Sequence, residues 1–183
     1  MEDSTHVLMQ HYGISPWELE VAYGIFNNKF SVEQEDTEYE GDEYVSIFEI
    51  DIPVVFGDAF FDWFGRKEWN KLKFLLKEMK RRRGGRKAIK TIVNFSSVPA
   101  VRFVVDVQDR DWYNDAIEKI DFMTELISHH LSADEIPKGT NAVTYRYIEK
   151  TKKWSILKAV ADGCNFIKKD DVWINQSKRD LDL

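Results

Sequence analysis

The chain has 183 residues, of which 43% are hydrophobic, and a formal net charge of −6. This length and composition predict one folded domain with a substantial core and argue against long disordered tracts. Cys164 is the only cysteine, so an internal disulfide is excluded. The acidic N-terminus lacks a signal-peptide pattern, and no segment reaches the apolar length of a membrane span. We therefore expect a cytoplasmic protein without membrane contact.

The first predicted element is a short helix over residues 16–26. Ser15, Pro16 and Glu18 form a capping box with proline at the first helical position. A strand over 19–25 is the alternative, because apolar and polar residues also alternate there.

An acidic run follows at residues 33–43, with seven acidic residues and no basic one. Such a run predicts a solvated loop or linker. The next stretch, 44–55, alternates as a strand, and Pro53 indicates that its pairing weakens toward its end.

Residues 66–83 predict a strongly basic helix that ends at Gly84-Gly85. Its apolar residues recur at steps of three and four, and glycine readily adopts the geometry that ends a helix. Twelve basic and two acidic residues lie between positions 66 and 90, a net charge of +10, so the rest of the chain carries −16. Such a separation of charge is evidence about binding partners rather than about the fold.

A β-hairpin is predicted from 88–95 and 101–107, with its turn at 96–99. A long helix capped by Asp109 or Asp111 and running to about residue 131 comes next. Strands at 142–149 and 154–161 then form a second hairpin, and a short strand lies within 166–174.

The order of elements predicts an α+β fold with a ferredoxin-like (βαββαβ) antiparallel sheet and two helices on one face. An extra C-terminal hairpin strand and an N-terminal helical segment complete it. The expected divisions are 1–43 for the helix and acidic linker, 44–174 for the ferredoxin-like domain and 175–183 for a polar tail. This architecture hosts many functions, so it identifies none.

The basic helix and the loop after it are a candidate surface for a polyanion such as nucleic acid, or for an acidic protein. Phosphate contacts of this kind give affinity without sequence readout. The alternative is a solvated basic face that the acidic run neutralises within the same chain. The candidate polyanion-binding residues are Lys73, Lys77, Lys80, Arg81, Arg82, Arg83, Arg86 and Lys87.

Carboxylates on the uncovered face of the predicted sheet are a second candidate site. Glu49, Asp51 and Asp106 could hold a divalent cation and support a metal-dependent enzyme. The alternative is a ladder of cross-strand ion pairs with Arg102 or Arg146. Lys90 and Asn94 are expected to be neighbours on that face.

Other residues carry weaker signals. Adjacent His129 and His130 at a helix end point in different directions, as expected for compensation of the helix dipole. His6, His11 and Cys164 lie in no recognisable metal or catalytic motif. An aromatic cluster is either a core lid or a partner-docking patch; its members are Phe56, Phe60, Phe61, Trp63 and Phe64.

We therefore predict a small binding or interaction protein without enzymatic activity. We expect no cofactor, and a nucleic acid or an acidic protein as partner. The alternatives are the metal-dependent enzyme and a structural homo-oligomer.

Overall fold

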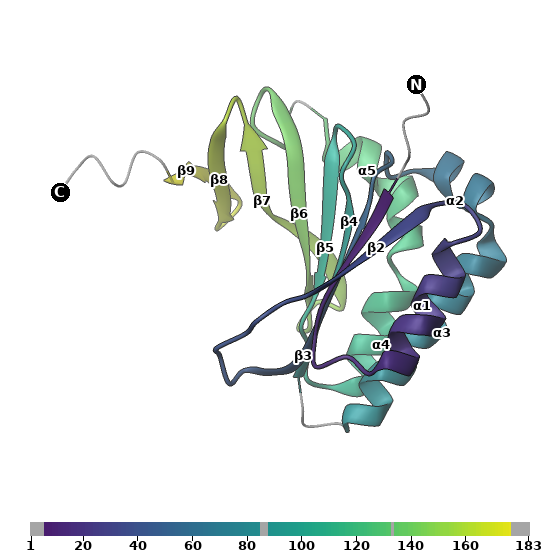
Figure 1. Ribbon diagram of the computed structural model, residues 1–183. Helices are drawn as coiled ribbons and strands as arrows, with labels where there is room; N and C mark the ends of the chain where they lie inside the picture. Colours follow the sequence, from purple (N-terminus) through teal and green to yellow (C-terminus); the bar gives the residue numbers. More distant parts are fainter. Residues whose placement is uncertain (1–5, 85–87, 133, 177–183) are drawn as a thin grey trace.

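The computed structural model describes residues 6–84, 88–132 and 134–176. Nine strands form one mixed sheet in the order β2-β1-β3-β4-β5-β6-β7-β8-β9 (Figure 1). The strands are β1 (His6–Tyr12), β2 (Ser31–Asp36), β3 (Tyr44–Ile52), β4 (Ala88–Phe95), β5 (Ala100–Val105), β6 (Thr140–Ile148), β7 (Lys153–Ala161), β8 (Cys164–Lys169) and β9 (Val172–Asn175).

The helices lie together on one side of the sheet and leave its other face open (Figure 1). They are α1 (Pro16–Phe26), α2 (Asp58–Phe64), α3 (Arg66–Arg83), α4 (Arg110–Glu118), the 3-10 helix η1 (Asp121–Met123) and α5 (Thr124–His130). The core fills the space between this layer and the sheet, because alternate strand residues such as Phe48, Val93 and Phe103 point into it and are fully buried.

The strand order does not follow the predicted ferredoxin-like pattern. That pattern inserts a third strand between the two joined by a helix, but here β3 pairs directly with β4, and β5 with β6, both in parallel. β1 and β2 form another such parallel pair across α1. The sheet is therefore mixed and larger than predicted, although the α+β class is confirmed.

The N-terminal region joins the same sheet. α1 begins as predicted, since Ser15 Oγ accepts from Glu18 N and Glu18 accepts from Ser15 N. The acidic run is only partly a loop, because residues 33–36 belong to edge strand β2. The boundary predicted at residue 43 therefore falls within one continuous sheet.

The basic helix and the hairpin after it are confirmed. α3 ends at Arg83, with Gly84 at a φ of 79°. β4 and β5 pair in antiparallel, with Val93 opposite Phe103. Gly85, Arg86 and Lys87 lie outside the described residues.

The long helix predicted to reach residue 131 is interrupted. Asp109 caps α4 by accepting from Asp111 N and Trp112 N, but α4 ends at Glu118 and η1 precedes α5. Asp121, in η1, turns its carboxylate toward Lys73 of α3 at 3.4 Å. The prediction of one helix was therefore wrong. Apolar residues keep helical spacing through the interruption, so periodicity alone does not reveal where α4 ends.

The C-terminal segment forms β8 and β9 rather than one short strand, and the pair is antiparallel. Four of the five residues of the aromatic cluster are buried, and Phe60 and Phe61 pack against Trp69 of α3. Trp63 remains 48% exposed. The cluster is therefore mainly part of the core.

Candidate binding sites

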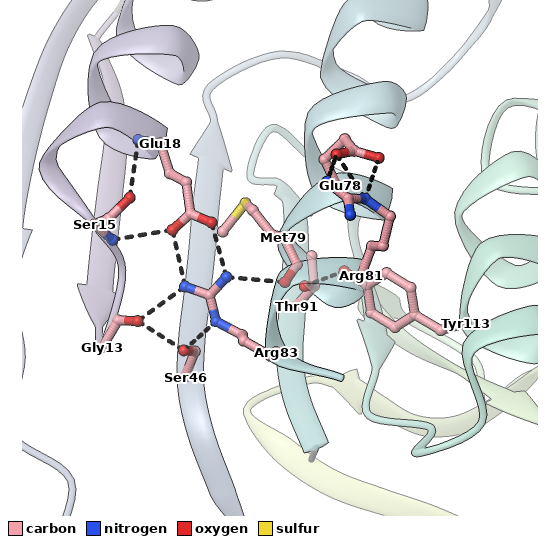
Figure 2. Close-up of polar contacts among 10 residues, drawn as sticks. All are labelled: Gly13, Ser15, Glu18, Ser46, Glu78, Met79, Arg81, Arg83, Thr91 and Tyr113. Atoms are coloured by element: carbon pink, nitrogen blue, oxygen red, sulfur yellow. Dashed lines mark hydrogen bonds and ion pairs between the residues drawn. The ribbon is translucent and has the colours of Figure 1, made fainter. Parts of the chain in front are cut away.

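Arg83 has no hydrogen-bond donor left for a polyanion (Figure 2). Its Nη1 and Nη2 donate to the two carboxylate oxygens of Glu18, each at 2.8 Å. The same nitrogens also donate to the carbonyl oxygens of Met79 and Gly13, both at 2.9 Å, and Nε donates to Ser46 Oγ at 2.5 Å. A guanidinium has five N–H donors. All five are used, so Arg83 joins the end of α3 to α1 and β3.

The contacts around Arg83 depend on close backbone approach. Gly13 has a φ of 63°, and a Cβ there would lie 2.4 Å from the carbonyl oxygen of Val45. The Glu18 side chain is only 2% exposed and that of Arg83 is 13% exposed. Burial raises the pKa of Glu18, but hydrogen bonds from Arg83 and Ser15 outweigh it and hold the pKa below its ordinary value. Glu18 therefore stays ionised as the buried counter-ion of Arg83.

The predicted lysines of α3 face the core side. Lys73 Nζ lies 3.0 Å from a Glu118 carboxylate oxygen, and Lys77 Nζ donates to the other oxygen of that carboxylate. Lys80 is fully buried, with its ammonium 6.0 Å from the centre of the Tyr113 ring. Burial lowers the pKa of Lys80. These lysines hold α3 against α4 rather than facing a ligand.

Two of the candidate arginines in α3 remain on the surface. Arg81 is half exposed and binds Glu78 through three contacts of 2.8 to 3.0 Å. Arg82 is exposed, and its guanidinium packs 4.5 Å from the centre of the Trp17 ring. Among the described residues, Arg82 has no carboxylate partner. Of the candidate polyanion contacts that the structure describes, it is the most available.

The acidic run does not neutralise α3. Its side chains contact β1, where Glu35 accepts from Gln10 at 2.8 Å and Asp36 lies 3.7 Å from His11. Within the described ranges, no ion pair joins residues 33–43 to α3. The neutralising carboxylates come instead from α1, α2, α3, α4 and η1, and sequence spacing alone did not identify them.

The open-face carboxylates form ion pairs across the sheet. Glu49 accepts from Arg102 and from Asn94, both at 2.8 Å. Asp106 accepts from Arg146 and, at 3.2 Å, from the Tyr44 hydroxyl. Burial and the nearby Asp106 carboxylate raise the pKa of Tyr44 to about 12.

Asp51 has no cationic partner among the described residues, and its Oδ1 is buried without a hydrogen bond. In the described part of the chain, no three His, Cys, Asp or Glu side chains come together that could hold a metal ion. The predicted ion-pair ladder is thus the better description of Glu49 and Asp106.

A groove of about 520 Å³ on the outer surface of the helix layer was missed by the sequence prediction. Trp17, Val21 and Ile25 of α1 form one wall, and Phe74 and Leu75 of α3 form the other. Phe74 is 64% exposed and Trp17 is 51% exposed. In the sequence, the signal for this groove was Phe74, because it is an aromatic residue that lies off the apolar stripe of a basic helix.

One residue of the histidine pair, His130, is half-buried and contacts a tyrosine. His130 Nδ1 lies 3.0 Å from the Tyr145 hydroxyl, and burial together with neighbouring His129 lowers the pKa of His130. A cavity of about 420 Å³ beside it also has Glu135 and Lys168 in its walls. Cys164 is half-buried at the start of β8.

Comparisons of the chain with protein-family models, with curated proteins and with solved structures find no match. Among the described residues, every helix is too short or too polar to cross a lipid bilayer. The function must therefore be argued from the surfaces described above.

Proposed function

We propose that this is a binding protein whose groove between α1 and α3 takes an acidic amphipathic helix from another protein. The observation that carries the proposal is the exposure of Trp17 and Phe74 in an apolar groove with an unpaired cation toward each end. Large aromatic residues in grooves are typical anchors of protein interfaces. A groove between two helices suits a third helix that presents apolar residues at steps of three and four.

Charge argues for an acidic occupant. Lys67, in the first turn of α3, is exposed and has no carboxylate partner among the described residues. Arg82, in the last turn, lies against Trp17 with its in-plane donors unbound to any described carboxylate. Fifteen residues separate the two positions along the sequence, roughly 22 Å of helix axis. An occupant helix of about four turns with a carboxylate near each end would meet both cations.

The same charges argue against a second copy of this chain. A two-fold interface brings identical surfaces together. It would place Lys67 and Arg82 of one copy near the same two cations of the other, and Glu78, the carboxylate in the groove lining, is already bound by Arg81. Like charges in contact weaken an interface.

A polyanion is the second candidate, favoured by the exposure of Arg81 and Arg82 in adjacent positions. The contact of Arg81 with Glu78 is a surface ion pair, which contributes little and can exchange for a phosphate. A salt series on single-stranded DNA binding tests this candidate with Arg81 and Arg82 replaced by Ala. Arg83 is kept, because its role in the fold would confuse the result.

The proposed helix docking is tested by display selection from a library of amphipathic helices with acidic, neutral or basic ends. The proposal predicts that helices with acidic ends are enriched and that all enriched helices compete with one another for binding. Enrichment of basic or neutral ends contradicts it. A dimer in light scattering that dissociates in Phe74→Ala also contradicts it, because the groove would then hold a second copy.

A further inference from the structure

A cavity of about 300 Å³ lies on the open face of the sheet, away from the helix groove. Four basic side chains from four neighbouring strands line it: Lys90 of β4, Arg102 of β5, Arg146 of β6 and Lys158 of β7. This is a concentration of positive charge in a chain with a net charge of −6. Structural pairing alone does not account for it.

Nearby carboxylates neutralise the charges of the two arginines but not those of the two lysines. Glu49 binds Arg102, and Asp106 binds Arg146. Lys90 and Lys158 have no carboxylate partner among the described residues, although the Lys90 ammonium lies 5.5 Å from the centre of the Tyr44 ring. Each arginine gives one nitrogen to its carboxylate, so its other donors remain available.

The register of the strands arranges one end of the cavity for an anion. Arg102 pairs with Thr144, and Thr144 pairs with Lys158, so the three form one row across β5, β6 and β7. The outer two strands are about 10 Å apart. The small Thr144 side chain leaves space between two long cations and adds a hydroxyl donor.

The rest of the lining is apolar. Val104 is 8% exposed in the cavity, and Leu157 lies beside it. A bare anion would use only the polar row. A ligand with an organic part would also cover these two side chains, and the volume lies at the lower end of the range for small-molecule sites.

We propose that this cavity binds a small organic phosphate ester. The phosphate lies between Arg102 and Lys158 and accepts from Thr144, and the organic part lies over Val104 and Leu157. Multiple charge-assisted hydrogen bonds to guanidinium and ammonium groups are the usual way in which proteins hold phosphate. This site is separate from the helix groove, so either proposal can fail without the other.

The test is calorimetric titration at low salt with ribose 5-phosphate, ribose, inorganic phosphate and a short single-stranded DNA. We expect ribose 5-phosphate to bind about tenfold more tightly than inorganic phosphate, a difference of about 1.4 kcal/mol, and ribose not to bind. Lys158→Ala and Thr144→Val should each weaken binding of ribose 5-phosphate severalfold. The control is Lys153→Ala, an exposed lysine on the same strand but outside the cavity.

Equal affinity for inorganic phosphate overturns the proposed ester, and tighter binding of DNA overturns the proposed small ligand. An equal loss in Lys153→Ala shows that general surface charge is responsible and overturns the site. No binding of ribose 5-phosphate overturns the proposal directly. Thermal unfolding of each variant confirms that it is folded, which is expected because Lys158 is exposed and Thr144→Val preserves side-chain volume.

Discussion

Arg83 shows how a residue that looks like a ligand contact serves the fold. In sequence it is the third arginine of a basic run, indistinguishable from Arg81 and Arg82. In the structure it is the best-paired of the three, because α3 brings it between α1 and β3. The pairing with Glu18 spans 65 positions in sequence, which no local pattern reports.

Glu18→Gln should lower the free energy of unfolding by about 3 to 5 kcal/mol, because it leaves the buried Arg83 charge without its counter-ion. Glu20→Gln is the matched control, an exposed position on the same helix, and should change the free energy by less than about 0.5 kcal/mol. Urea denaturation measures both. Equal stability of the two variants would show that the Arg83 network contributes little.

His130 should make the protein less stable as the pH falls below about 6.5. Its folded-state pKa is lowered, so the unfolded chain takes up the proton first, and stability is lost from the unfolded pKa downward. His130→Gln should reduce this slope of unfolding free energy against pH. His6→Gln, at an exposed position in β1, is the control, because His129 itself helps to lower the pKa of His130. A slope changed equally by both variants would contradict the assignment.

At the scale of elements, the sequence predicted what local chemistry determines. The Ser15 cap, the Asp109 cap, the end of α3 at Gly84 and the β4–β5 hairpin are all confirmed. The sequence prediction missed β1 and β2, because β1 has histidine and glutamine among its apolar residues and β2 is mostly acidic. β1 pairs with β3, and β2 pairs with β1, and such pairing between distant segments stabilises both strands but leaves no periodic signal.

The predicted strand order was wrong for a related reason. A strand–helix–strand pattern fits adjacent parallel strands as well as strands separated by a third. The choice depends on long-range contacts. Likewise, the groove depends on how α1 packs beside α3, whereas the sequence shows only the exposed Phe74.

Phe74→Ala should weaken binding of a selected acidic helix at least about tenfold while leaving the unfolding free energy nearly unchanged. A buried aromatic anchor at an interface contributes about 2 kcal/mol or more, but Phe74 is mostly exposed in the unbound protein. Phe122→Ala is a close control, since Phe122 is 63% exposed and lies outside the groove. Equal losses in the two variants would indicate a nonspecific apolar contact.

At the scale of the whole molecule, the separation of charge is largely resolved within the fold. The stretch around α3 carries +10, but carboxylates of α1, α2, α3, α4 and η1 bind most of the α3 cations that the structure describes. The cations that remain lie toward the ends of an apolar groove on one face and around a cavity on the other. The surface therefore offers two small sites rather than one basic ridge.

The most direct measurement is the affinity of a selected acidic helix and of its basic-ended counterpart for the double variant Lys67→Glu/Arg82→Glu. The proposal predicts that the variant loses the acidic helix and gains the basic one, because the apolar walls of the groove are unchanged and the charges toward its ends are reversed. Retention of the acidic helix at wild-type affinity would contradict the proposed docking.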